Sequence, residues 1–263
     1  STLKAIKLKP DFAEAYYNLG IILKDLDNLT EAELYTRKAI ELKPDYANAY
    51  LNLGIILKEI GKLQDAERYT RKAIDIKPDL ASAHSNLGSI LIDFGQLNEA
   101  ELSLRQAIKF KPNYQDAYVN LAYIKLLLGD YQEGLDFYEY RDKIKSIHSI
   151  PIVHEVDQLN FKNGEKLLIV SEQGLGDTIQ YMRYIPYLRD QGFEISFCAQ
   201  KKLHTLIKSS GIDLNPIEPE KANIISEGRW IRLLSLPKLL KINPDNPIIS
   251  KPYIFTKQEF VKK

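Results

Sequence analysis

The sequence has a single cysteine, Cys198, among its 263 residues, so no disulfide can form within the chain. Such scarcity is typical of proteins in a reducing compartment, and we predict a cytoplasmic location. No uninterrupted apolar run reaches the roughly 18 residues that a membrane-spanning helix requires. No secretory signal is visible either. We therefore predict a chain without a membrane span.

The sequence also lacks an excess of charge of either sign. It has 36 Lys and Arg residues against 35 Asp and Glu residues, a net charge of +1. Nucleic-acid binding usually needs a dense basic field, so we predict no nucleic-acid partner. Three histidines, His148, His154 and His204, lack the spacing of metal ligands. Neither a metal nor a cofactor is predicted.

A repeat of 34 residues fills the first half of the chain. Residues 4–37 align without gaps on residues 38–71, with 23 of the 34 positions identical. A third copy spans residues 72–105, and a looser fourth copy spans residues 106–139. The stretch before Pro10 matches the end of a further copy. The chain therefore starts inside a repeat, and we expect it to be a piece of a longer protein.

Each copy keeps small, apolar and proline residues at fixed places, which in the first copy are Tyr16, Leu19, Gly20, Leu23, Ala32, Ala39 and Pro44. This pattern resembles the tetratricopeptide repeat (TPR). The resemblance implies two antiparallel helices per copy, because the small residues allow close approach and proline ends the second helix. Stacked copies would form an α-solenoid, a right-handed superhelix with a concave surface. The fourth copy drifts, with Ala122 in place of glycine, Gly134 in place of alanine and Arg141 in place of alanine.

One asparagine recurs in the first helix of every copy, at Asn18, Asn52, Asn86 and Asn120. A carboxamide donates and accepts hydrogen bonds at once, so a row of them suits the backbone of an extended peptide. The superhelical TPR arm of O-GlcNAc transferase is similar, with an asparagine ladder that holds its polypeptide substrate. Alternatively, each asparagine bonds a neighbouring helix and stabilises the stack. The sequence leaves both interpretations open.

The pattern changes after the repeats. We divide the chain into a TPR array at 1–142, a connector at 143–164 and a small α/β, Rossmann-like domain at 165–263. Apolar runs predict strands at 166–170 and 194–199, with further strands in 222–226 and 230–236. Helices are expected at 178–190, 201–211 and 237–242. Alternation of strands and helices predicts a parallel sheet covered on both faces.

The loop between the first predicted strand and helix, EQGLGD at 172–177, is the candidate site of this domain. Gly174 and Gly176 are followed by Ile179 where a dinucleotide fingerprint needs a third glycine, and no P-loop lysine is present. One interpretation is therefore a tight turn in which the glycines relieve strain and Asp177 caps the helix.

Residues 172–192 together with LLSLP at 233–237 also resemble the region that follows TPR arrays in many bacterial proteins. That region is similar to the amino-terminal half of GT-B glycosyltransferases, notably the ADP-heptose:lipopolysaccharide heptosyltransferases. The match rests on Gly176, Asp177 and Pro186, and it implies that Asp177 is the base that deprotonates an acceptor hydroxyl. Thr178 and Gln180 would add polar contacts. About 26 residues follow LLSLP, too few for the half that binds the nucleotide sugar.

We therefore predict a TPR scaffold that binds a protein or peptide and carries an incomplete glycosyltransferase-like domain, inactive in this form. The alternative is a fragment of a TPR-containing GT-B glycosyltransferase, which recruits an acceptor through its repeats. In that case a nucleotide sugar is a partner only of a longer parent protein. A third possibility is a structural solenoid without a ligand.

Overall fold

The computed structural model describes residues 2–141, 164–172, 174–225, 227–247 and 253–254. The chain divides into two compact units, Ser1–Arg141 and Asp142–Lys263, which are described separately below. Apart from Gly164, the predicted connector at 143–164 lies outside the described residues.

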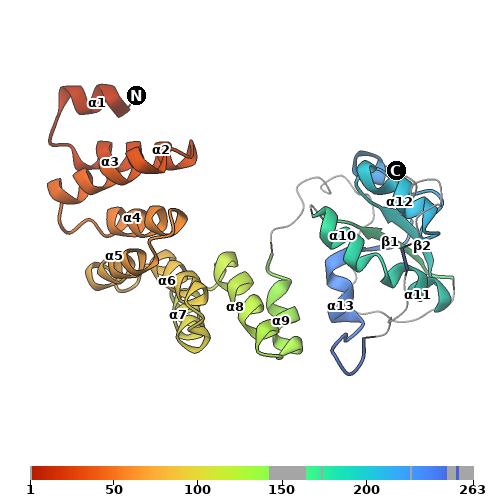
Figure 1. Ribbon diagram of the computed structural model, residues 1–263. Coiled ribbons are helices and arrows are strands. Elements are labelled where there is room, and N and C mark those ends of the chain that lie inside the picture. The colour runs from red at the N-terminus through yellow and green to blue at the C-terminus, as the bar shows by residue number, and fades with distance from the viewer. Residues whose placement is uncertain (1, 142–163, 173, 226, 248–252, 255–263) are drawn as a thin grey trace, which may run out of the picture. The chain divides into compact units, whose positions relative to one another are not determined.

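The first unit is entirely helical (Figure 1). After a short α1, the helices form four successive pairs that correspond to the four copies of the repeat. Their bounds are α1 (Thr2–Leu8), α2 (Ala13–Asp25), α3 (Leu29–Leu42), α4 (Ala47–Glu59), α5 (Leu63–Ile76), α6 (Ala81–Asp93), α7 (Leu97–Phe110), α8 (Gln115–Leu127) and α9 (Tyr131–Tyr138). The prediction of stacked antiparallel helix pairs is confirmed for this half of the chain.

Small residues allow the two helices of each pair to lie close together. Ala32 and Ala39 of α3 are fully buried. A β-carbon at Gly20 of α2 would collide with the hydroxyl of Thr36 on α3, so only glycine fits there. The turn between the helices also needs a left-handed residue, which is Asp27 in the first copy (φ 60°) and Gly61 in the second (φ 80°).

The first helices of successive pairs contact one another, α2 with α4, α4 with α6, and α6 with α8. In a curved stack, the helices that approach their equivalents most closely lie on the inner side. We call the exposed side of these four helices the inner surface.

The second unit contains a three-stranded parallel sheet of β1 (Lys166–Val170), β2 (Glu194–Cys198) and β3 (Arg229–Arg232), in the order β2-β1-β3. The strand expected within 222–226 is wrong. That segment belongs mainly to a 3₁₀ helix, η3 (Pro219–Ile224), whose first residue is a proline, a residue that favours helix starts.

The predicted helix at 178–190 is two helices, α10 (Leu175–Tyr181) and α11 (Tyr184–Asp190). Pro186 explains the break, because it has no amide hydrogen and its ring would clash with the carbonyl of Met182 in a continuous helix. The segment predicted as a helix at 201–211 forms η2 (Lys201–Leu203) and α12 (His204–Ser209). The strand predicted at 230–236 is shorter than expected, because β3 ends at Arg232. The chain then forms η4 (Leu233–Ser235) and α13 (Leu236–Leu239).

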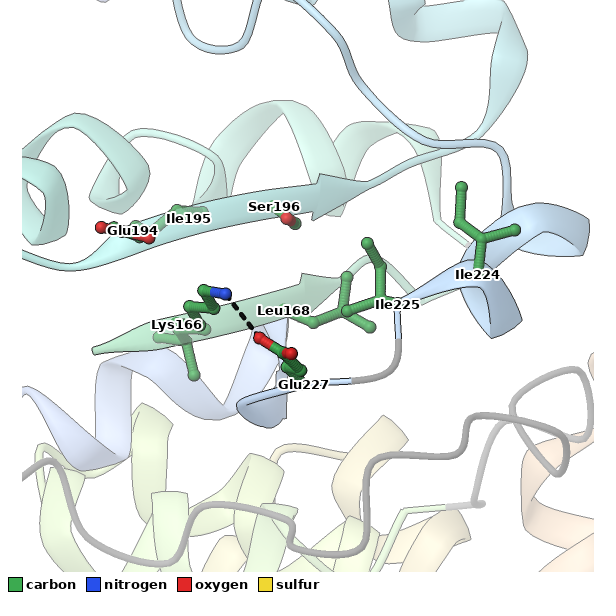
Figure 2. Close-up of a pocket in the computed structure, with 9 residues that line it drawn as sticks. Lys166, Leu168, Glu194, Ile195, Ser196, Ile224, Ile225 and Glu227 are labelled. Carbon is green, nitrogen blue, oxygen red and sulfur yellow. Dashed lines mark hydrogen bonds and ion pairs between the residues drawn. The ribbon is translucent and has the colours of Figure 1, made fainter. Parts of the chain in front are cut away.

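Alternating side chains of the strands point to opposite faces of the sheet. On one face, Leu168, Val170 and Cys198 form a small buried cluster with Ala222 of η3. Beside it lies an open recess of about 490 Å³ over the amino half of β1 and β2, in which Lys166 pairs with Glu227 at 2.6 Å (Figure 2). Among the described residues this face has no helical layer beyond η3, so the predicted cover on both faces is only partly present.

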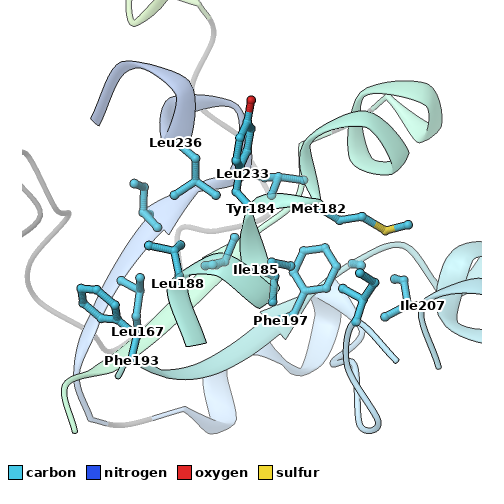
Figure 3. Close-up of a cluster of buried hydrophobic side chains, with 14 of the residues drawn as sticks. Leu167, Met182, Tyr184, Ile185, Leu188, Phe193, Phe197, Ile207, Leu233 and Leu236 are labelled. Atoms are coloured by element: carbon cyan, nitrogen blue, oxygen red, sulfur yellow. The ribbon is translucent and has the colours of Figure 1, made fainter. Parts of the chain in front are cut away.

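The opposite face of the sheet carries the main core of the unit (Figure 3). Leu167, Ile169 and Phe197 of the sheet pack there against Ile185 and Leu188 of α11. Each of these five side chains is at most 1% exposed to solvent. Burial of this kind supplies about 1.5–3 kcal/mol per large apolar side chain. The sheet and α11 therefore fix the position of the loop that joins β1 to α10.

Candidate functional site

Contacts between side chains of α4 and α6 locate the inner surface at residue level. Lys58 of α4 donates to Ser89 Oγ of α6 at 2.6 Å and pairs with Asp93 at 3.3 Å. Ser89 and Asp93 lie one turn apart on α6, on the same face as Asn86.

Four repeat-equivalent positions, spaced i, i+4, i+7 and i+11, therefore form a stripe on the inner side of each first helix. We call it the inner stripe of α2 (Glu14, Asn18, Ile21, Asp25), α4 (Asn48, Asn52, Ile55, Glu59), α6 (Ser82, Asn86, Ser89, Asp93) and α8 (Asp116, Asn120, Tyr123, Leu127).

The second position of each inner stripe is the predicted asparagine, but the four asparagines have different surroundings. Asn52 is 6% exposed and its Nδ2 donates to Thr36 Oγ1 at 3.1 Å. Asn86 is half-buried and donates to Thr70 Oγ1 at 2.8 Å. Each of these bonds joins a first helix to the second helix of the preceding copy, as the alternative interpretation expected.

Asn18 is exposed and Asn120 is half-buried, and neither carboxamide makes a hydrogen bond within the described part of the chain. The reason for Asn120 is visible in the repeat. Leu104, which is fully buried, replaces the threonine at the position equivalent to Thr36 and Thr70. A leucine side chain has no hydrogen-bond acceptor, so the carboxamide of Asn120 keeps both its donor and its acceptor free.

The fourth copy is joined to the third by an ionic cluster that the sequence did not suggest. Lys125 occupies the place of Leu23, Leu57 and Leu91 in the earlier copies. Its ammonium lies 3.0 Å from both Glu101 and Glu133, and hydrogen bonds to these carboxylates raise its pKa.

Arg105 completes this cluster, at 2.7 Å from Glu101 and 3.0 Å from Glu133. Two cations and two anions alternate, so the charges balance. The cluster links α7, α8 and α9 on the side of α8 away from its inner stripe, and it stabilises the contact between copies.

In the second unit, a polar cluster lies where β1 and β2 end. Gln200 Oε1 accepts hydrogen bonds from Ser171 Oγ at 3.2 Å and Thr178 Oγ1 at 3.1 Å, and Gln200 Nε2 donates to the Glu172 carbonyl. Ser171 and Thr178 are buried. Thr178 therefore holds the loop in place and does not face solvent, unlike the contact role expected of it. Gln200, which sequence reasoning missed, directly follows the second apolar run.

Asp177 is exposed in the first turn of α10. The N-cap position of this helix is Gly174, and no side chain accepts a capping hydrogen bond there. The predicted cap by Asp177 is therefore absent. The Asp177 carboxylate instead folds back against Gly174, where a β-carbon would collide with it. Gly176 faces open space. Gln173 of the same loop lies outside the described residues.

A carboxylate joins the ends of β1 and β3. Glu172 Oε2 accepts a hydrogen bond from the Leu234 amide of η4 at 3.2 Å. In parallel sheets, ligands bind outside the carboxyl ends of strands where the chain order reverses, which is here between β1 and β3. Among the described residues, Glu172 is bonded at this edge, and Asp177 follows it in the first turn of α10.

Cys198 is fully buried, and burial raises the pKa of its thiol to about 12. Within the described ranges, no group of three or more His, Cys, Asp or Glu side chains is arranged to hold a metal ion. No helix among the described residues is long and apolar enough to cross a membrane.

Comparison with known proteins supports the repeats. Family models for the tetratricopeptide repeat match residues 11–79, and residues 81–114 and 115–139. The first unit therefore carries tetratricopeptide repeats. No curated protein matches the chain.

Several solved structures share the fold of about half the chain. PilW, a type IV pilus biogenesis factor, is 24% identical, with 55% of this chain and 69% of PilW covered at a TM-score of 0.50. PilF of Pseudomonas aeruginosa is 17% identical, and the match covers 55% of this chain and 68% of PilF at a TM-score of 0.50. Cut9–Hcn1 of the APC/C is 15% identical, and the match covers 53% of this chain and 27% of the other at a TM-score of 0.51. At these identities the likeness concerns the fold alone.

Proposed function

We propose that the chain is a protein-binding scaffold whose repeats hold an extended peptide along the inner surface. The observation that carries the proposal is the asparagine in every inner stripe, with the carboxamides of Asn18 and Asn120 free of hydrogen bonds to the described residues. Such a carboxamide accepts from a peptide N–H and donates to a peptide C=O without regard to side chains.

Random dodecapeptides displayed on phage and selected against the intact chain test this function. Binding of selected peptides, measured by fluorescence anisotropy, should weaken about 10-fold in the double variant Asn18→Ala and Asn120→Ala. Asn52 and Asn86 are left unchanged, because their replacement would also disturb the stack. Asn98→Ala on the exposed side of α7 is the matched control. Selected peptides that bind the double variant and the parent chain equally would contradict the asparagine row.

We propose further that the second unit is the Rossmann-like, amino-terminal half of a glycosyltransferase-like fold and that it does not transfer sugar on its own. The sheet order β2-β1-β3 and the tethered loop at the carboxyl ends of the strands support this proposal. The single cysteine, buried in β2, suits a cytoplasmic scaffold.

The second candidate function is sugar transfer by a longer parent protein, with Asp177 as the base toward an acceptor held by the repeats. The exposed carboxylate of Asp177 at the carboxyl edge of the sheet favours it. A parent protein extended beyond Lys263 would then transfer sugar from a nucleotide sugar, and Asp177→Asn would abolish transfer without changing peptide affinity. Equal transfer by the Asn variant would eliminate Asp177 as the base.

A further inference from the structure

The inner stripe of α8 differs from the stripes of the other three copies. Its four residues, Asp116, Asn120, Tyr123 and Leu127, follow one another at helical spacing on one face. None of the four side chains has a hydrogen-bond, ion-pair or aromatic partner among the described residues.

Each of the other stripes is partly occupied by contacts within the chain. The bonds and ion pairs concerned are Glu14–Lys43 at 3.5 Å and Asp25–Lys24 at 3.0 Å on α2, Asn52–Thr36 on α4, and Asn86–Thr70, Ser89–Lys58 and Asp93–Lys58 on α6. The stripe of α8 is therefore free from end to end in the part of the chain that the structure describes.

The carboxyl-terminal half of this stripe, Tyr123 and Leu127, is apolar although it is exposed. Tyr123 is 53% exposed and Leu127 is 56% exposed. Their equivalents on α6 are Ser89 and Asp93. A large aromatic ring and an aliphatic side chain in water lack the stabilisation that burial would give them, so a partner that covers both is favoured.

We propose that the inner stripe of α8 is the anchor point for the bound peptide, and that it selects a segment with a bulky apolar residue and a nearby basic residue. This inference rests on the proposed peptide-binding function. The apolar side chain packs on Tyr123 and Leu127, the backbone beside it bonds the carboxamide of Asn120, and the basic side chain pairs with the exposed carboxylate of Asp116.

The polar half of the stripe decides in favour of an extended peptide over a purely apolar partner. An apolar surface docked on Tyr123 and Leu127 would cover Asn120 without a hydrogen-bond partner and press close to the unpaired carboxylate of Asp116, which is unfavourable for both groups. An extended backbone supplies the missing donor and acceptor, and a Lys or Arg side chain supplies the missing cation.

The dimensions of α8 limit the spacing of the two selected residues. Asp116 and the midpoint of Tyr123 and Leu127 are about nine residues apart, which is about 13 Å along a helix. An extended chain covers that distance in about four residues. The basic residue should therefore lie within about four positions of the apolar one.

The same display library of random dodecapeptides tests the anchor. Enriched peptides should carry a bulky apolar residue with Lys or Arg within four positions. The double variant Tyr123→Ala and Leu127→Ala should weaken their binding at least about 10-fold. Asp116→Asn should weaken it about threefold and reduce its dependence on salt. Leu34→Ala, at a leucine that is 63% exposed on α3, should leave the affinity within twofold.

The outcomes separate the anchor from the function on which it rests. If no peptide is enriched above background, the proposed function fails and the anchor fails with it. If peptides are enriched but bind the Tyr123, Leu127 and Asp116 variants as tightly as the parent chain, the anchor alone is refuted. Sedimentation velocity of the parent chain and of Leu127→Glu adds a third check. A dimer that the variant converts to a monomer would show a second copy on this stripe and overturn the inference.

Discussion

Replacing each asparagine of the row by alanine should give four different changes in stability. Asn52→Ala removes a hydrogen bond between two buried groups, the carboxamide of Asn52 and the hydroxyl of Thr36, which is 0% exposed. Loss of such a bond costs about 1–2 kcal/mol. Alanine returns about 0.6 kcal/mol through its higher helix propensity. We therefore expect a net loss of about 1 kcal/mol.

The other three substitutions should change the free energy of unfolding less than Asn52→Ala does. Asn86 is half-buried, so water can replace its bond to Thr70, and we expect a net change of about 0–0.5 kcal/mol. Asn18 and Asn120 have no bond to lose within the described residues. Their replacement by alanine should leave the protein as stable as before, or more stable by about 0.5 kcal/mol.

Urea unfolding followed by circular dichroism at 222 nm measures the series, because α1–α9 supply most of the helical signal. A change of about 1 kcal/mol corresponds to a shift in the urea midpoint of roughly 0.3–1 M. A double-mutant cycle with Thr36→Val isolates the bond itself, and we expect a coupling of about 1 kcal/mol between Thr36 and Asn52. The reasoning is refuted if Asn52→Ala is no more destabilising than Asn120→Ala, or if the coupling is close to zero.

Three further experiments test other parts of the structure. Gly54→Ala should destabilise the repeat unit by about 1–3 kcal/mol in the same urea assay, because its β-carbon would collide with the Thr70 hydroxyl. Cys198 should resist a thiol reagent such as DTNB at pH 8 until the protein unfolds, since burial excludes the reagent and raises the thiol pKa to about 12. The hydrogen bond from Lys125 holds the pKa of Glu133 below its ordinary 4.5, so its stabilisation is present above pH 4.5 and is lost as the pH falls through the lower, folded-state value. The parent chain should therefore lose more stability than Lys125→Met between pH 5 and 3, and equal losses would contradict the ion pair.

The repeat unit follows closely from the sequence because its contacts recur. Each copy touches only its neighbours, so the same residues meet at the same 34-residue offset along the whole array. Gly20 and Ala32 recur for that reason, and their spacing is enough to predict the paired helices. The buried strand at 166–170 was also predictable, because its five residues are too few for a typical helix and a glycine-containing loop follows them.

The predictions that were wrong concern places where one residue overrides a longer sequence pattern. The apolar periodicity of 178–190 is helical throughout, yet Pro186 divides it into α10 and α11. Asp177 suits a helix cap, but the helix begins two residues before it, which places its carboxylate in the first turn. Leu104 shows from the sequence alone that Asn120 has no threonine to bond, but whether Asn52 and Asn86 reach theirs depends on the angle between successive copies.

The fourth copy shows how a few substitutions can change two surfaces of one helix at once. Leu104 removes the hydroxyl that would hold Asn120, and Leu127 removes the acid that the inner stripe carries in earlier copies. Both changes weaken polar contacts between copies on the inner side. Lys125 compensates on the opposite side of α8 by joining Glu101 and Glu133. A helix that has moved its polar contacts from its inner to its outer side stays attached to the stack while its inner side is free to meet a partner.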